Sequence, residues 1–228
     1  KVGVRVLPTT DQMMRGLADV SKLQEVDITD LLGRDEIAPD EELIHKDIKG
    51  HNILVTGAGG SVGSEMCREI LNGSPKRLVL LEQNELALYK VELALKKLSS
   101  IQIIPCLGSV NDSILVKNIL NEQKINTVFH AAAYKHVPLI EDNALEGLKN
   151  NVLGTKTLLK ECMESDVSSF ILISTDKAVR PTSVMGASKR IAEMIIQNTS
   201  LNFPERRMGI VRFGNVLDSS GSVVPLFR

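Results

Sequence analysis

Four consecutive polar residues, Ser174, Thr175, Asp176 and Lys177, directly follow an apolar run at 170–173. Their hydroxyl, carboxyl and amine groups can hydrogen-bond a sugar hydroxyl, donate a proton and accept one. The same tetrapeptide could instead cap a helix or form a polar loop. Its place after a predicted strand favours catalysis, because ligands of parallel α/β sheets bind at the carboxyl ends of the strands.

Met185 and Lys189 form a second candidate pair, four residues apart on one face of a predicted helix. A buried methionine usually serves packing, and a helix lysine can simply be solvated. If this face points toward a bound cofactor, Lys189 could hold ribose hydroxyls instead.

The segment NILVTGAGGSVG at 52–63 joins an apolar run, a glycine-rich turn and a helical pattern. This arrangement places a pyrophosphate at a helix N-terminus. Gly57 permits the turn, Gly60 a close approach of the backbone to phosphate, and Gly63 tight helix–sheet packing. The predicted phosphate-binding residues are Gly57, Gly60, Ser61, Val62 and Gly63.

The ends of the other predicted strands carry further candidates. A carboxylate at Glu82 would accept hydrogen bonds from the adenosine ribose and repel a 2′-phosphate, which favours NAD over NADP. The alternative for Glu82 is a surface acid at a helix start. Small residues expected to flank adenine and nicotinamide are Ser109, Val110, Ala131, Ala132 and Ala133, with Lys135 and His136 next at the cleft mouth. The alanines could equally serve a tight helix–sheet contact.

Alternating strand and helix patterns from residue 53 onward would position these groups. Strands are predicted at 53–55, 77–81, 101–106, 127–133, 170–174 and 208–213, and helices at 64–71, 85–98, 112–122, 142–163 and 183–201. Six strands with crossover helices predict an α/β fold, a Rossmann-type doubly wound parallel sheet.

Composition excludes several classes of protein. Hydrophobic residues make up 43% and charged residues 24%, which is typical of a soluble globular protein. The net charge of −1 gives no indication of nucleic-acid or acidic-membrane binding. Three cysteines without a C-x-x-C pair predict neither a disulfide framework nor a metal site, and they fit a reducing cytosol. No apolar run approaches the roughly 18 residues of a membrane span, and no signal peptide is recognised.

Two domains are expected. From the residues alone, 1–47 are predicted to be a linker that packs on the next domain, with a strand at 2–7 and a short helix at 10–17. Residues 48–228 are predicted to form the NAD-binding domain and the start of a substrate-binding region. Because the chain lacks an initial Met and ends just after apolar residues 223–227, both ends are expected to be cut from something larger.

Five blocks of sequence carry a family resemblance: VTGAGGSVGSE (55–65), FHAAAYKHVP (129–138), NNVLGT (150–155), STDKAVRPTSVMGASKR (174–190) and VRFGNVLDSSGSVVPLF (211–227). Together they resemble the extended short-chain dehydrogenases/reductases that act on nucleotide sugars. The nearest subgroup is the bacterial polysaccharide-biosynthesis nucleotide-sugar 4,6-dehydratases, whose larger members are membrane-anchored. Residues 1–34, especially EVDITDLLGR (25–34), resemble the end of the preceding nucleotide-binding-like domain in those members. The resemblance thus implies that residues 1–47 are the tail of that domain plus a linker. The resemblance implies that an upstream transmembrane part and most of the substrate lobe are missing, so this chain should bind cofactor but turn over poorly.

The resemblance also implies a reaction and roles. Carbon 4 of the sugar is oxidised with NAD as hydride acceptor, water is lost across carbons 5 and 6, and the hydride returns to carbon 6. Thr175 would hold the 4-hydroxyl, Asp176 would be the acid and Lys177 the base. The implied substrate contacts are Lys135, His136, Asn151 and Asn215, with Asn215 on the diphosphate.

Two positions depart from the wider family. Met185 stands where the family has the tyrosine of Tyr-x-x-x-Lys, and a thioether cannot act as a base. The large membrane-anchored dehydratases also have methionine there, which leaves Lys189 and a water as candidates for the base at carbon 4. Ser109 stands where many relatives have an adenine-binding aspartate.

Other functions remain open on the same scaffold. A nucleotide-sugar epimerase or 4-dehydrogenase would need the oxidation but not the pair Asp176 and Lys177. A non-catalytic NAD-binding module is the third alternative, and Met185 is its best support. The expected partner is a UDP-N-acetylhexosamine substrate, with no nucleic acid, in a homo-oligomer. The expected location is the cytoplasm, with the full-length parent anchored in the bacterial inner membrane.

Overall fold

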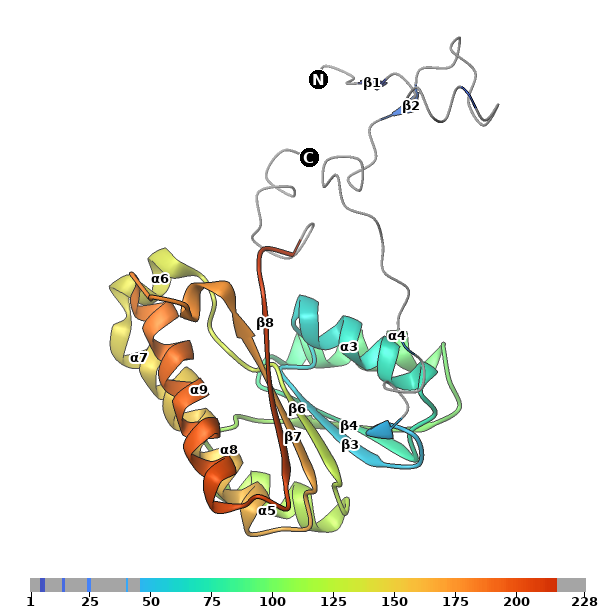
Figure 1. Cartoon of the computed structure of the whole chain (residues 1–228). Coiled ribbons are helices and arrows are strands. Elements are labelled where there is room, and N and C mark those ends of the chain that lie inside the picture. The colour runs from blue at the N-terminus through green and yellow to red at the C-terminus, as the bar shows by residue number, and fades with distance from the viewer. Residues whose placement is uncertain (1–4, 7–13, 15–23, 26–39, 41–45, 217–228) are drawn as a thin grey trace. The chain divides into compact units, whose positions relative to one another are not determined.

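The computed structural model describes residues 5–6, 14, 24–25, 40 and 46–216 (Figure 1). The chain divides into two compact units, Lys1–Pro39 and Asp40–Arg228. In the first unit, β1 (Arg5–Val6) pairs antiparallel with β2 (Gln24–Glu25). Most of the predicted helix at 10–17 and the apolar segment 223–227 lie outside the described residues.

The second unit begins before the predicted start of the NAD-binding domain at residue 48. Asp47 forms an ion pair with Arg207, and its carbonyl oxygen accepts a hydrogen bond from the Thr127 hydroxyl at 3.0 Å. Ile48 is buried in the core of this unit. These contacts explain why residues just before 48 belong to the second unit.

A six-stranded parallel sheet forms the centre of the second unit, in the order β5-β4-β3-β6-β7-β8. Its strands are β3 (Asn52–Thr56), β4 (Arg77–Glu82), β5 (Gln102–Leu107), β6 (Thr127–His130), β7 (Ser169–Thr175) and β8 (Arg207–Phe213). The chain runs outward from β3 to β5, then returns to place β6 on the other side of β3. The fold class predicted from the sequence is therefore confirmed. Ligands of such sheets bind where the strand order reverses, here between β3 and β6.

Helices cover both faces of the sheet, with α3 and α4 on one face and α5, α8 and α9 on the other (Figure 1). Their bounds are α3 (Ser61–Asn72), α4 (Glu85–Lys96), α5 (Ser113–Glu122), α8 (Gly154–Met163) and α9 (Val184–Asn202). Each face has its own core, the first including Ile53 and Leu80, the second Leu54 and Phe170. Burial on both faces accounts for the continuous apolar runs of the central strands. Within the described part of the chain, no helix is both long and apolar enough to span a bilayer.

The region after β6 differs from the prediction. Strand β6 ends at His130 rather than at residue 133. The next two backbone N–H groups still donate to Thr56, Ala131 to its carbonyl oxygen at 3.1 Å and Ala132 to its hydroxyl oxygen at 3.3 Å, and the three alanines form a loop.

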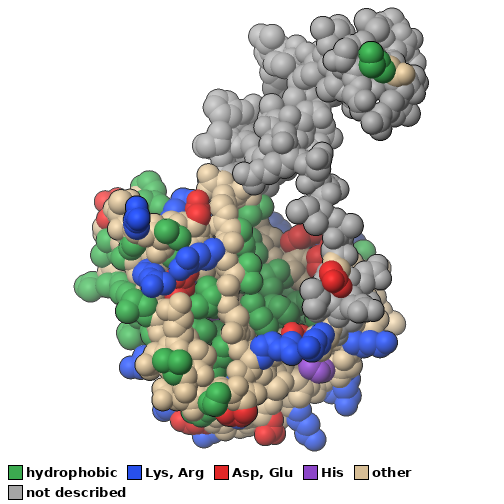
Figure 2. Space-filling view, viewed as in Figure 1, with side chains coloured by type: hydrophobic (Ala, Val, Ile, Leu, Met, Phe, Trp, Pro, Cys, Tyr) green, Lys and Arg blue, Asp and Glu red, His purple; other side chains and the backbone are tan. Residues whose placement is uncertain are grey.

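The helix predicted at 142–163 is a continuous helical run that begins two residues later, at Ala144, and includes a π-helical turn. A separate helix, α6 (Val137–Asp142), begins with a proline at its first turn, a position that proline favours. Helix α7 (Ala144–Leu148) follows, and a π-helical turn at Lys149–Leu153 leads into α8. On the face seen in Figure 2, apolar side chains gather at the left of the second unit, over α6 and α7, which carry the exposed Leu139 and Leu145.

Candidate active site

The glycine-rich turn connects β3 to α3, which begins at Ser61, earlier than the predicted Ser64. Gly57 has a φ of +67°, and a Cβ atom there would lie 2.7 Å from the backbone N and Cα of Ala132. A Cβ at Gly63 would collide with the Gly57 carbonyl oxygen. At Gly60 a Cβ would meet only that oxygen, at 3.3 Å, so its other side is open. Turn and packing thus require Gly57 and Gly63.

Gly57→Ala tests this close approach. We expect it to lower the free energy of unfolding by about 2–5 kcal/mol, combining a left-handed residue with overpacking. Gly50→Ala is the matched control, because Gly50 also has a positive φ, +72°, but has no atom within 4 Å of an added Cβ. Gly50→Ala should lower the free energy of unfolding by about 1–2 kcal/mol. Urea unfolding measures both, and equal losses would contradict the packing role of Gly57.

A pocket of about 250 Å³ opens beside this turn, at the carboxyl ends of β3, β4, β5 and β6. It brings together most of the residues predicted to bind cofactor, which are Gly57, Gly60, Glu82, Ser109, Val110, Ala131, Ala132 and Ala133. Ser61, Val62 and Gly63 form the adjoining first turn of α3. Sequence analysis missed Gly59, Gly108 and Asn150, which also line the pocket.

The Glu82 carboxylate is held inside this pocket by two backbone groups. One oxygen accepts from the N–H of Gly59 at 3.1 Å, and the other accepts from the N–H of Asn84 at 2.9 Å. The carboxylate therefore links the glycine-rich turn to the start of α4. Its negative charge lies at the strand end where the sequence predicted a ribose contact.

A buried hydrogen-bond chain crosses the strand ends behind the pocket. Thr155 donates to the Asn151 carbonyl oxygen at 2.7 Å, so its hydroxyl oxygen is left to accept from His130 Nε2 at 2.9 Å. His130 Nδ1 then accepts from the Thr56 hydroxyl at 2.7 Å. Burial lowers the pKa of His130 to about 3, which keeps the ring neutral. Sequence analysis did not identify this histidine.

Asn151, for which the resemblance implied substrate binding, is buried and hydrogen-bonded within the chain. Its side chain is 1% exposed, accepts from the N–H of Tyr134 at 2.8 Å, and donates at 3.0 Å to both the Tyr134 carbonyl oxygen and Ser188 Oγ. These bonds use its polar atoms, so Asn151 joins the loop after β6 to α9. The π-helical turn places its neighbour Asn150 at the pocket.

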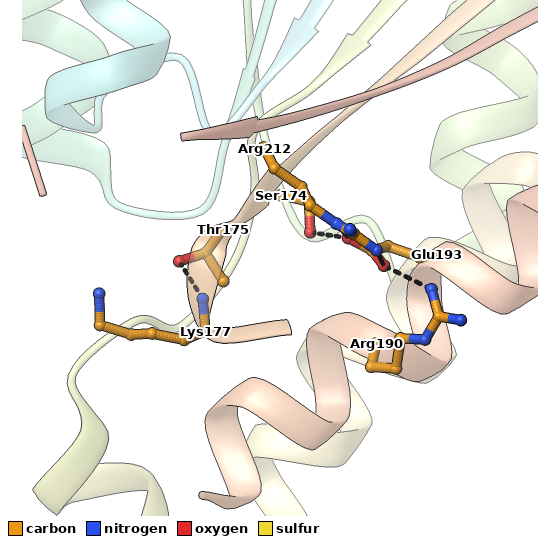
Figure 3. Close-up of polar contacts among 6 residues, drawn as sticks. All are labelled: Ser174, Thr175, Lys177, Arg190, Glu193 and Arg212. Atoms are coloured by element: carbon orange, nitrogen blue, oxygen red, sulfur yellow. Dashed lines mark hydrogen bonds and ion pairs between the residues drawn. The ribbon is translucent and has the colours of Figure 1, made fainter. Parts of the chain in front are cut away.

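Residues at the ends of β7 and β8 form a connected polar group. Thr175 Oγ1 donates to Asp176 Oδ1 at 2.9 Å. Lys177 Nζ donates to Asp176 Oδ1 at 3.1 Å and to Asn215 Oδ1 at 3.0 Å. The structure thus brings these four predicted residues together. Ser174 points the other way, toward Glu193 of α9, because side chains alternate along a strand (Figure 3).

The side chains of Asp176 and Lys177 contact each other in this structure. The pKa of Asp176 is lowered, first by the Thr175 hydrogen bond and then by that from Lys177. The carboxyl group is exposed and paired in this structure, so a raised pKa, which a proton donor needs, stays a prediction for the substrate complex.

The remaining predicted residues fall into a buried and an exposed pair. Met185 and Lys189 are 4% and 5% exposed. Lys189 Nζ donates to the Ile173 carbonyl oxygen of β7 at 2.6 Å, and burial lowers its pKa to about 8 against an opposing effect of Glu193. Lys135 and His136 are exposed between β6 and α6.

Comparison with known proteins agrees with this architecture. Residues 53–228 match a protein family described as polysaccharide biosynthesis protein. The capsular polysaccharide biosynthesis protein CapD of Staphylococcus aureus is 44% identical over 224 residues, which are 97% of this chain and 37% of that protein. An inverting UDP-N-acetylglucosamine 4,6-dehydratase of Campylobacter jejuni is 33% identical over 184 residues, 78% of this chain and 52% of that protein.

A solved structure shares the fold. It is DesIV, a dTDP-glucose 4,6-dehydratase from Streptomyces venezuelae with NAD and TYD bound. The TM-score is 0.62 at 23% identity, and the match covers 70% of this chain and 54% of that one. The chain spans about half or less of the length of these proteins. The family match and the sequence identities show that the chain belongs to the polysaccharide biosynthesis protein family of extended short-chain dehydrogenases/reductases.

Proposed function

We propose that this protein is an NAD-dependent nucleotide-sugar 4,6-dehydratase that converts UDP-N-acetylglucosamine to a 4-keto-6-deoxy product in bacterial surface polysaccharide biosynthesis. The observation that carries the proposal is the polar group of Thr175, Asp176 and Lys177 at the end of β7. An epimerase or a 4-dehydrogenase has no use for an adjacent acid and base. The name of the Campylobacter relative supports the same substrate and reaction.

The pocket beside the glycine-rich turn fits NAD. Gly60 leaves the backbone accessible on one side, and the first turn of α3 can receive a pyrophosphate. Glu82 would hold the adenosine ribose, and Ala131–Ala133 leave room for the nicotinamide half. When bound, NAD supplies a reversible hydride acceptor.

The residues of this chain would divide the proton transfers. Thr175 would hold the 4-hydroxyl, and Lys177 would remove the proton from carbon 5 once carbon 4 is a ketone. Asp176 would protonate the hydroxyl leaving carbon 6, which requires a raised pKa in the substrate complex. Substrate bound between Lys177 and Asp176 would break their contact and remove one cause of the lowered pKa of Asp176.

The proton of the 4-hydroxyl needs another acceptor, because the thioether of Met185 is not a base. Lys189 is one candidate, since a pKa of about 8 makes a useful fraction neutral near pH 8. A water is the other candidate. Asn215 would contact the substrate diphosphate and already accepts a hydrogen bond from Lys177.

The proposal is tested by incubating UDP-N-acetylglucosamine with the protein that has its natural termini. Mass spectrometry then measures the mass of the sugar product. Loss of one water supports a dehydratase. An isomer of unchanged mass would show an epimerase, net reduction of added NAD a 4-dehydrogenase, and an unchanged substrate a non-catalytic module. We further propose a homo-oligomer in the cytoplasm, with the parent protein anchored to the inner membrane.

Glu82 predicts the choice of cofactor. We expect NAD to bind at least tenfold more tightly than NADP, because the carboxylate would repel a 2′-phosphate. Glu82→Gln should narrow this ratio, whereas Glu85→Gln, an acid in the first turn of α4, should not. Calorimetry at equal salt measures both dissociation constants. Equal or tighter binding of NADP by the unmodified protein would contradict this role of Glu82.

A further inference from the structure

Glu193 is a carboxylate that is buried completely, with 0% of the residue exposed. One oxygen accepts from Ser174 Oγ at 2.6 Å and from Arg212 Nε at 2.7 Å. The other accepts from Arg212 at 2.6 Å and from Arg190 at 3.0 Å. Figure 3 shows the four side chains converging from β7, β8 and α9. Such a buried charge is stable only because every lone pair has a partner.

The partners of Glu193 determine which elements it fixes. Ser174 and Arg212 are directly opposite each other on the paired strands β7 and β8. The Glu193 carboxylate bonds to both, so it attaches α9 to the carboxyl ends of two strands at once. Lys189 lies one helical turn earlier on α9 and bonds to the Ile173 carbonyl oxygen of β7. These contacts leave little freedom for α9 to slide along the sheet.

We propose that Glu193 is a positioning residue of the active site, which fixes α9 against the ends of β7 and β8 and so holds the Lys189 amine at the site. Glu193 does not line the cofactor pocket and does not contact Thr175, Asp176 or Lys177, so it acts through Lys189. The expected effect on cofactor reduction rests on the proposed function, whereas the expected effect on the titration of Lys189 does not.

Charge adds a second link between the two residues. Burial alone would raise the pKa of Glu193, but hydrogen bonds from Arg212, Ser174 and Arg190 outweigh burial and lower it to about 2. Glu193 is therefore ionised at neutral pH, and its charge stabilises the ammonium form of Lys189. The other charged groups on the elements that pack against α9 are Glu141, Asp142, Glu146, Lys149, Lys156, Lys160, Glu161, Asp176, Lys177, Arg207 and Arg212, with Arg190 on α9 itself. His130 of β6 also interacts with Lys189 electrostatically.

Direct titration of Lys189 tests the proposal. The protein with its natural termini is labelled with ¹⁵N-lysine, and the Lys189 signal is assigned by its loss in Lys189→Met. We expect Glu193→Gln to move the titration midpoint to lower pH by about one unit, because an opposing negative charge is lost. Arg212→Gln should move it to higher pH, because the carboxylate keeps its charge with one cation fewer. Glu164→Gln, in an exposed pair with Lys160, should leave it unchanged.

The two substitutions make the test robust to misfolding. If Glu193→Gln does not fold, the upward shift of the Lys189 midpoint in Arg212→Gln tests the proposal. We expect Arg212→Gln to fold, because Arg212 is 39% exposed and glutamine retains a hydrogen-bond donor. Unchanged midpoints in the folded variants would overturn the proposal. The pH profile of cofactor reduction by UDP-N-acetylglucosamine should shift in the same directions. If the unmodified protein never reduces its cofactor, the proposed function fails, while the titration still decides the role of Glu193.

Discussion

Asp176→Asn and Lys177→Ala are each expected to slow dehydration roughly a hundredfold or more, as loss of a general acid or base does. Both variants should keep nearly unchanged NAD affinity, because neither side chain lines the cofactor pocket. Both should still oxidise carbon 4, so reduced nicotinamide should accumulate on the enzyme after mixing with UDP-N-acetylglucosamine. Its absorbance and product mass spectrometry measure the two halves of the reaction separately.

Matched controls come from the same chain. Asp166→Asn and Lys160→Ala make the same chemical changes at exposed positions and should leave both rates unaltered. Full dehydration rates in Asp176→Asn or Lys177→Ala would show that the pair has only a structural role. Absence of reduced nicotinamide in both would instead assign the pair to the oxidation step.

The second large effect concerns Lys189, whose pKa of about 8 lies below the ordinary value of 10.5 because its amine is buried. Between these two values the folded protein binds fewer protons than the unfolded chain, so stability rises with pH. At pH 7 both states are protonated, and the full cost of burying the charge, about 3 kcal/mol, is present. The cost falls as the pH rises from about 8 to 10.5.

Lys189→Met isolates this effect. Methionine removes the buried charge but retains a long apolar side chain. We expect the stability of the unmodified protein minus that of Lys189→Met to rise by about 2–3 kcal/mol between pH 7 and pH 10. Urea unfolding at each pH measures the difference in stability between the two proteins. The lost hydrogen bond to Ile173 contributes equally at every pH, so it does not affect the change in this difference. A flat difference would mean that Lys189 titrates normally, which removes it as a candidate base near pH 8.

The sequence predicted the sheet well because its signals are local. Apolar runs such as 53–55 mark strands that are buried on both faces, and the glycine spacing marks the turn onto α3. Helix α6 was missed, although Pro138 was a signal for a helix start before residue 142.

The candidate site was less predictable because side-chain direction depends on distant partners. Strand alternation could have placed Ser174 and Thr175 on opposite faces. By contrast, the roles of Asn151 and Glu193 depend on Tyr134 and Arg212, which lie far from them in the sequence. The lowered pKa of Asp176 also follows from its contacts, which residue types alone do not reveal.

The central claim is that one hydride leaves carbon 4 and returns to carbon 6 of the same sugar. UDP-N-acetylglucosamine with deuterium at carbon 4 tests it directly, in ordinary water and with the protein at its natural termini. The account predicts a product that has lost one water and carries the deuterium in its carbon 6 methyl group, as read by mass spectrometry and NMR. Deuterium retained at carbon 4 of an isomer, transferred to free cofactor, or left in unchanged substrate would contradict it.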